Sequence, residues 1–136
     1  MIYHTVQEIH TISTSIMVGV IWVMQIVHYP IFRFVNKEEY HDFQNFHMKR
    51  ISYIVVPSMI VELLSGIIVL YLNINISFQF QASMALLIII WMLTGFVFSN
   101  IHNNLLNGFN IKTGYSLILW NWVRTTLWSI RLFLIL

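Results

Sequence analysis

Three histidines, His28, His47 and His102, have the residue type and the placement that a metal centre requires. Each belongs to a different apolar segment and lies near the end that we assign to the cytoplasmic leaflet. Three imidazoles at one depth can bind zinc, iron or copper, or supply an axial ligand to haem. No local ligand motif such as HExxH is present, so this hypothesis depends on convergence in space. The alternative is that these are interfacial histidines bonded to headgroups, backbone or loop acids.

A second polar group is predicted deeper in the membrane. Glu62, Gln25 and Arg124 each lie roughly ten residues, or about 15 Å of helix, from the nearest cytoplasmic loop. Either charge alone would be costly at that depth, so we expect an ion pair between Glu62 and Arg124. The pair is explained equally by a structural clamp and by a catalytic or proton-relay role. The candidate catalytic residues are Glu62, Arg124, Asn121 and Gln25, with Arg131 beside them.

Two further residues are candidates for a separate role. His10 lies on the same helix face as His28, but about 27 Å away at helical rise, so the two cannot share a metal. Trp128 and Arg124 could wall a flat hydrophobic ligand such as a porphyrin, a quinone or a polyene. Ordinary helix packing explains Trp128 as well.

The composition of the chain excludes several classes of protein. Of 136 residues, 58% are hydrophobic and 9% charged, and the mean hydropathy is +0.75, which excludes a soluble enzyme. There is no cysteine, so disulfides and thiolate metal sites are excluded. The net charge of +2 is too small to suggest nucleic acid as a partner.

The elements that must position these residues are helices. Four segments approach or exceed the ~20 apolar residues that cross ~30 Å of hydrocarbon. They predict helices at about 5–35, 47–72, 82–107 and 115–136 of a single domain, 1–136. The first starts at a capping box formed by Thr5 and Glu8, and Pro30 predicts a bend near its end. The fold class is therefore all-α, an integral membrane antiparallel four-helix bundle.

The segment 36–50 is polar but amphipathic. We expect it to form a short interfacial helix between the first two helices, or to extend the second helix into the cytosol. With Arg33, it gives the first connection four basic residues, and the third connection has Lys112, while the second has none. Positive residues favour the cytoplasm, so both termini are predicted to face the periplasm or exterior of a bacterial inner membrane.

Three stretches resemble a family of small, uncharacterised four-helix bacterial membrane proteins. They are GVIWVMQIVHYPIF at 19–32, HMKRISYIVVPSMIVEL at 47–63 and NWVRTTLWSIR at 121–131. The resemblance covers most of the chain and brings no established activity with it.

A more distant resemblance is to HemJ-type protoporphyrinogen oxidases and CopD-like membrane proteins. It is carried by His10, Gly19, Pro30, the basic pair leading into Ile-x-x-Pro-x-Met at 48–59, and Asn121. The similarity implies haem b and porphyrinogen oxidation, with His10 as a candidate axial ligand.

Together these features predict an integral membrane metal- or haem-binding protein, an oxidoreductase acting on a lipophilic small molecule. The three histidines would hold the cofactor, haem b or a non-haem zinc, iron or copper ion, and the deeper polar residues would position substrate or relay protons. The alternative is a non-catalytic membrane subunit or small transporter whose polar core serves assembly or solute passage. Under either interpretation the expected partners are the lipid bilayer and a lipophilic small molecule, with a homo-oligomer as a further option. Whether the chain is an enzyme stays open.

Overall fold

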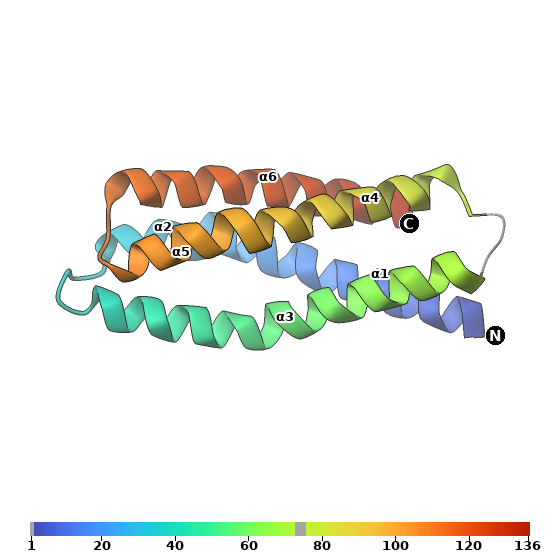
Figure 1. Ribbon diagram of the computed structural model, residues 1–136, viewed down its shortest axis with the longest axis horizontal. Coiled ribbons are helices and arrows are strands. Elements are labelled where there is room, and N and C mark those ends of the chain that lie inside the picture. Colours follow the sequence, from blue (N-terminus) through green and yellow to red (C-terminus); the bar gives the residue numbers. More distant parts are fainter. Residues whose placement is uncertain (1, 73–75) are drawn as a thin grey trace.

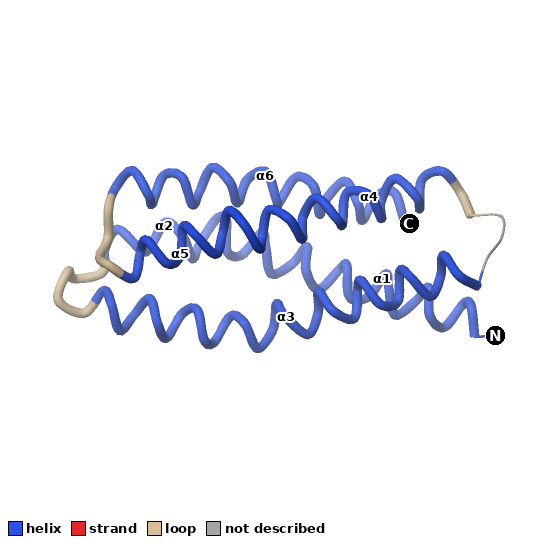
Figure 2. The backbone as a smooth tube through the Cα atoms, viewed as in Figure 1, coloured by secondary structure: helices blue, strands red, loops and turns tan. Residues whose placement is uncertain are grey.

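The chain forms a bundle of four long helical stretches, as predicted. The computed structural model describes residues 2–72 and 76–136, and within these ranges it contains helices and no strand. Figure 1 shows the helices lying side by side along one axis, with both chain ends toward the same end of the bundle. In Figure 2 the described loops lie at the two ends, outside the helical body.

The first stretch changes its winding where the sequence predicts a bend. It comprises α1 (Ile2–Val23), a π-helical turn η1 (Met24–His28), the short α2 (Tyr29–Ile31) and a 3₁₀ turn η2 (Phe32–Phe34). Pro30 has no N–H to bond to a carbonyl of the preceding turn, which favours such an irregularity. The helix starts at Ile2, before the capping box at Thr5.

The second stretch corrects one prediction. The helix α3 (Tyr40–Leu72) is continuous over 33 residues and passes through Pro57. Residues 36–50 therefore do not form a separate interfacial helix; from Tyr40 onward they are the first turns of α3, as the alternative interpretation held. The reason is packing, since Tyr40, Gln44 and His47 on one face of this part are buried.

The third and fourth stretches begin at capped ends. The third comprises α4 (Phe78–Met92), the π-helical η3 (Leu93–Phe98) and α5 (Ser99–Leu106), and the Ser77 hydroxyl accepts a bond from the Phe80 N–H at 3.3 Å. After α5, Gly108 takes a φ of 119°, a conformation that favours glycine and ends the helix. The fourth stretch, α6 (Ile111–Ile135), starts where the Asn110 side chain accepts from the Lys112 N–H at 2.9 Å.

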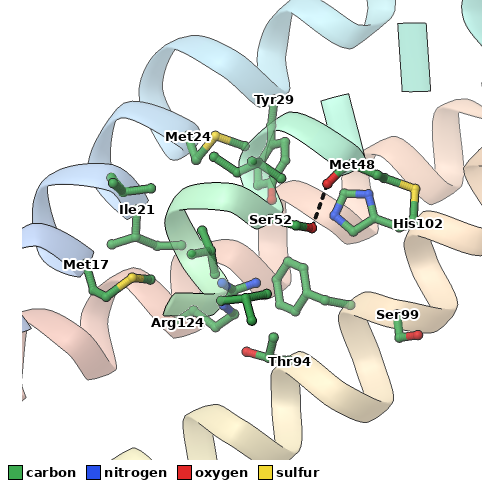
Figure 3. A pocket seen from close by; sticks show the side chains of 15 residues that line it. Met17, Ile21, Met24, Tyr29, Met48, Ser52, Thr94, Ser99, His102 and Arg124 are labelled. Carbon is green, nitrogen blue, oxygen red and sulfur yellow. Dashed lines mark hydrogen bonds between the residues drawn. The ribbon is translucent and has the colours of Figure 1, made fainter. Parts of the chain in front are cut away.

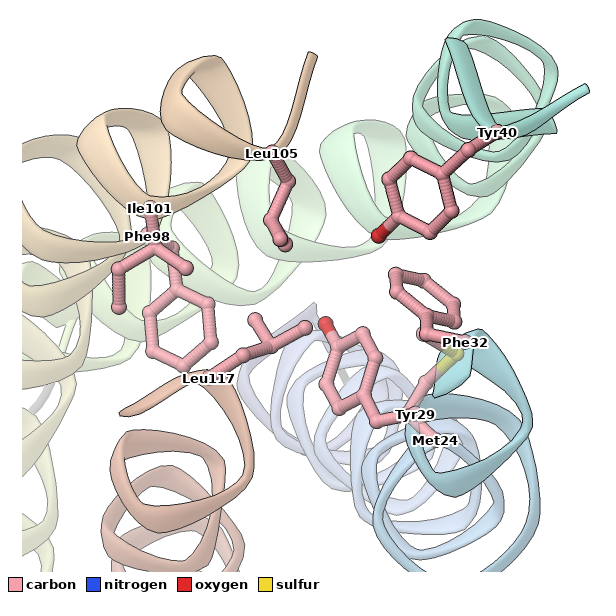
Figure 4. Close-up of a cluster of buried hydrophobic side chains, with 8 residues drawn as sticks. All are labelled: Met24, Tyr29, Phe32, Tyr40, Phe98, Ile101, Leu105 and Leu117. Carbon is pink, nitrogen blue, oxygen red and sulfur yellow. The ribbon is translucent and has the colours of Figure 1, made fainter. Parts of the chain in front are cut away.

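An aromatic-rich cluster closes the end of the bundle at which α3 and α6 begin. Its residues come from all four stretches, as Figure 4 shows: Met24, Tyr29, Phe32, Tyr40, Phe98, Ile101, Leu105 and Leu117. Two further apolar clusters fill the middle and the opposite end. This packing fixes the relative rotation of the helices and hence the faces that meet inside.

The bundle is apolar outside and partly polar inside. Large apolar side chains on its surface include Phe78, Phe96 and Phe133, which are 76–83% exposed. By length and composition, three of the helices in the described residues can cross a membrane: Ile2–Phe34, Tyr40–Leu72 and Phe78–Leu106. The fourth, α6, is 25 residues long and carries Asn121, Arg124 and Arg131 on its buried face.

Candidate functional site

The predicted polar helix faces do turn inward. Most of the predicted site residues are buried, and His28 and His102 are partly buried. The buried ones are His10, Gln25, His47, Glu62, Asn121, Arg124, Trp128 and Arg131. They do not meet in one place, however. All but Arg124, which lines a cavity, belong to three separate groups.

The ion pair of Glu62 is made with Arg131 and not with Arg124, which corrects the prediction. Arg131 Nη1 contacts Glu62 Oε1 directly, and both side chains are fully buried. Arg131 Nε also donates to the Ser83 carbonyl at 2.9 Å. Trp128 Nε1 lies 3.3 Å from both carboxylate oxygens of Glu62. This carboxylate thus has a cation and a neutral donor around it.

His10 belongs to the same group. Its Nδ1 lies 2.9 Å from the Glu62 carbonyl oxygen and 3.1 Å from Ser65 Oγ. A carbonyl can only accept, so Nδ1 carries the proton and donates. The other nitrogen, Nε2, is then free to accept from Arg131 Nη2, which lies 3.4 Å away. A neutral His10 therefore fits as a bridge between α3 and α6.

These contacts do not fit the roles that the haem resemblance implies. An axial ligand needs a free ring nitrogen facing open space, whereas both nitrogens of His10 face protein partners and its side chain is fully buried. Trp128 is also fully buried and directs its N–H to Glu62. The group has the geometry of a clamp that joins α1, α3, α4 and α6.

Gln25 and Asn121 form the second group. Asn121 Nδ2 donates to Gln25 Oε1 at 2.7 Å, and both side chains are buried. Gln25 lies in the π-helical turn η1. The four residues predicted to be catalytic therefore do not share one site, because Glu62 pairs elsewhere.

The third group contains the three histidines, which lie side by side. His28 Nε2 and His47 Nδ1 are 2.8 Å apart, and the ring centroids of His47 and His102 are 5.6 Å apart. His102 Nδ1 accepts from Gln44 Nε2 at 2.9 Å. His47 Nε2 is buried without a hydrogen-bond partner in the described part of the chain.

Side-chain proximity does not by itself make a metal centre. In residues 2–72 and 76–136 no group of three or more His, Cys, Asp or Glu side chains is arranged to hold a metal ion. One nitrogen from each of His28 and His47 is used in their mutual hydrogen bond. Metal binding by these histidines stays a prediction.

Two residues of these groups were not among those predicted from the sequence. Gln44 is fully buried and bonds to His102. Its position one turn before His47 was the available signal, and it points inward only if residues 36–50 extend the second helix, which was one of two interpretations. The backbone carbonyl of Ser83 accepts a hydrogen bond from Arg131. A backbone contact of this kind cannot be predicted from residue types.

A half-enclosed cavity of about 190 Å³ lies between the helices, next to the histidines. Apolar side chains supply most of its wall, and Figure 3 shows Arg124, Tyr29 and His102 entering it from α6, α2 and α5. Its remaining polar residues are Ser52, Thr94 and Ser99. Ser52 and Ser99 are exposed, as is the lining residue Val56, so the mouth opens sideways between α3 and α5.

Arg124 is the chemically distinctive residue of this cavity. It is 5% exposed, and its Nε has no hydrogen-bond partner among the described residues. Its guanidinium carbon lies 4.0 Å from the Phe98 ring centroid and 5.2 Å from that of Trp128. Within the described ranges, the one ion pair of this bundle interior uses Arg131 instead. A buried cation without a counter-charge is costly, and an anion in the cavity would relieve that cost.

Comparisons with protein-family models, with curated proteins and with solved structures gave no match to this chain.

Proposed function

We propose that this chain is an integral membrane protein that binds a lipophilic small molecule in the cavity beside Arg124. In this proposal the four helices run antiparallel across a bacterial inner membrane, with the basic first and third connections in the cytoplasm. The single observation that carries the proposal is the cavity. Its mouth opens sideways onto an apolar outer surface, and its interior holds a buried guanidinium that forms no ion pair within the described residues.

The polarity of the bundle supports membrane insertion. Aromatic side chains such as Phe96 and Phe133 are exposed on the surface, whereas Glu62, Arg124 and Arg131 are buried. Ionisable residues inside membrane helices face the bundle interior or a cavity, because lipid cannot solvate them. A soluble bundle would have the reverse distribution.

The position of the cavity supports a ligand that arrives from the bilayer. Its exposed lining residues, Ser52, Val56 and Ser99, lie on the sides of α3 and α5 and away from the loops. A molecule dissolved among lipid tails can enter there without crossing water. Ligand sites between helices of bundles are common, with an apolar wall and few polar groups.

An enzyme that transforms such a molecule and a transporter that moves it share this binding step. The oxidoreductase activity and the haem or metal cofactor stay predictions. Ring nitrogens that would bind the cofactor, in His10 and in the histidine cluster, form hydrogen bonds within the protein instead. The binding step is therefore the part to test first.

The test is photolabelling with a neutral probe. A decanol that carries a diazirine on its chain is added to the protein in phosphatidylcholine nanodiscs, and labelled residues are mapped by mass spectrometry. We expect labels on cavity residues and a loss of this labelling in Val55→Trp, which fills the cavity. The control is Ile67→Trp, because Ile67 lies on the exposed face of the same helix and should leave labelling unchanged. Label spread evenly over the outer surface, with no effect of Val55→Trp, would refute the proposal.

A further inference from the structure

The unpaired charge of Arg124 restricts what the cavity can hold. Arg124 is only 5% exposed, and it contributes to the cavity wall. Arg131, on the same face of α6, has its carboxylate partner, whereas Arg124 has two aromatic rings. A guanidinium stays charged at any ordinary pH, so burial without a counter-ion leaves a strong preference for an anion.

The aromatic contacts of Arg124 determine which shape of anion can bind to it. Phe98 and Trp128 lie against the guanidinium, at 4.0 and 5.2 Å from ring centroid to guanidinium carbon. Cation–π contacts use the flat face of the group and leave its N–H edges available. Nε itself is enclosed and has no partner in the part of the chain that the structure describes, so a ligand in the cavity meets the terminal nitrogens of the group. A free guanidinium edge matches a carboxylate, which can accept two parallel hydrogen bonds.

The remaining lining residues limit the charge of the ligand. Arg124 is the one Lys or Arg side chain among the residues that line the cavity. The Ser52 and Thr94 hydroxyls already donate to backbone carbonyls, at 2.7 and 2.8 Å. His102 accepts from Gln44 through Nδ1, so its neutral ring keeps the proton on Nε2 and adds a neutral donor. One cation and few free donors suit a single negative charge.

The size and the mouth of the cavity define the rest of the molecule. A volume of about 190 Å³ slightly exceeds the ~150 Å³ of an engineered cavity that binds benzene. It therefore holds a headgroup and a short length of chain. A longer chain must leave through the mouth between α3 and α5, where it would meet the exposed apolar surface and the surrounding lipid.

From these contacts we propose that the ligand is a single-chain amphiphile with a carboxylate head, such as a fatty acid, seated on the N–H edge of Arg124. This inference rests on the proposed function, since it names the chemical class of the molecule that the same cavity binds. The carboxylate provides the counter-charge that residues 2–72 and 76–136 do not, and the alkyl chain of the ligand occupies the apolar wall and the mouth.

The test compares two probes that differ only in the head. Decanoic acid and decanol, each with a diazirine at the same carbon, are titrated at pH 9 into the nanodisc-embedded protein, and cavity labelling is measured. A charge-assisted hydrogen bond contributes about 1.5–3 kcal/mol, which corresponds to roughly tenfold or more in affinity. We expect the acid to label the cavity with half-saturation at a concentration at least about tenfold lower than the alcohol.

Variants attribute that preference to Arg124. Arg124→Gln should remove the difference between the probes, and Arg124→Lys should retain only part of it, because an ammonium lacks the bidentate edge. The control is Arg50→Gln, which removes an exposed arginine that also lies over an aromatic ring, Phe46. It should leave the preference unchanged. A preference that survives in Arg124→Gln would overturn the inference.

A test without variants guards against misfolding of the Arg124 proteins. In the wild type, unlabelled decanoate should displace the acid probe at a concentration at least about tenfold lower than methyl decanoate does. Equal competition by the ester, or by a phospholipid, would overturn the carboxylate assignment while the proposed function stands. Absence of cavity labelling by either probe would instead refute the proposed function.

Discussion

Arg131 on α6 binds the Glu62 carboxylate on α3, and Arg124, two helical turns earlier on α6, does not. Both Arg131 and Glu62 are fully buried. The helix pairing thus separates the two arginines of this face by role. One neutralises a carboxylate of the protein, and the other lines a cavity.

The first prediction concerns this ion pair. Glu62→Gln leaves the Arg131 cation without its counter-charge and should lower the free energy of unfolding in detergent by about 3–5 kcal/mol. Replacing both residues, as in Glu62→Leu with Arg131→Met, should recover most of this loss. The control Glu8→Gln changes an exposed acid and should stay within about 0.5 kcal/mol of the wild type. A larger coupling of Glu62 with Arg124 than with Arg131 in double-mutant cycles would contradict the assignment.

The sequence was sufficient to predict the helical bundle but not the partner of Glu62. The pairing depends on how far along its helix each charged residue lies. At about 1.5 Å per residue, Glu62 lies roughly 33 Å from the start of α3 at Tyr40, and Arg131 roughly 30 Å from the start of α6 at Ile111. Arg124 lies only about 20 Å from that start. The predicted depth of Glu62 was counted from a cytoplasmic loop about ten residues away, whereas α3 begins at Tyr40, so Glu62 lies farther from that end than predicted.

The environment of Arg124 and the cavity beside it cannot be predicted from residue types alone. Apolar run length and helical spacing identify the helices and the buried faces, because burial follows the 3.6-residue period. Whether a buried cation pairs with an acid or with rings such as Phe98 depends on the rotation and register of whole helices. The free edge of Arg124 and the cavity beside it appear only when three other helices are in place.

The second prediction concerns the close approach of α3 to its neighbours at Gly66. A Cβ there would lie 2.5 Å from Met84 Sδ and 3.0 Å from His10 Cε1. Met84 can move, but His10 is held by hydrogen bonds at both ring nitrogens. Gly66→Ala should therefore reduce stability by about 1 kcal/mol or slightly more.

The matched control is Gly19→Ala, since a Cβ at Gly19 meets nothing within 4 Å. It should be neutral or stabilising, by up to about 1 kcal/mol, because alanine is the better helix former. Thermal unfolding of the two variants in the same detergent measures the contrast. Equal effects would show that α1, α3 and α4 do not pack closely around Gly66.

The third prediction concerns the amide pair. Asn121 donates to Gln25 at 2.7 Å between two helices, so Asn121→Leu and Gln25→Leu should each destabilise the protein, with a coupling energy of about 0.6–2 kcal/mol. The pair formed by Asn45 and His41 is exposed, and Asn45→Leu should have almost no effect. A coupling near zero for Gln25 and Asn121 would mean that the amides do not meet.

The fourth prediction decides between a hydrogen-bonded and a metal-bound histidine cluster. His28 Nε2 and His47 Nδ1 are bonded to each other at 2.8 Å, so a metal ion held by both nitrogens would replace this hydrogen bond. Protein without stoichiometric zinc, iron or copper and without a Soret band would contradict the predicted cofactor and leave the hydrogen-bonded cluster. Elemental analysis and an optical spectrum of the wild type and of His28→Ala provide the measurement. Stoichiometric metal that is lost in the variant would establish a metal centre at these histidines. A Soret band would make His10 the next residue to replace.

The fifth prediction concerns orientation in the membrane. The chain has no cysteine, so single-cysteine variants give a labelling signal without background. Lys37, in the first connection, and His4, near the N-terminus, are both exposed. The basic first connection should stay in the cytoplasm. A membrane-impermeant maleimide should therefore label His4→Cys in intact spheroplasts and Lys37→Cys only after permeabilisation.

The reverse labelling pattern would show that the protein has the opposite orientation in the membrane. Labelling of both variants in intact spheroplasts would show that the first helix, Ile2–Phe34, does not cross the membrane, although its length and composition allow it.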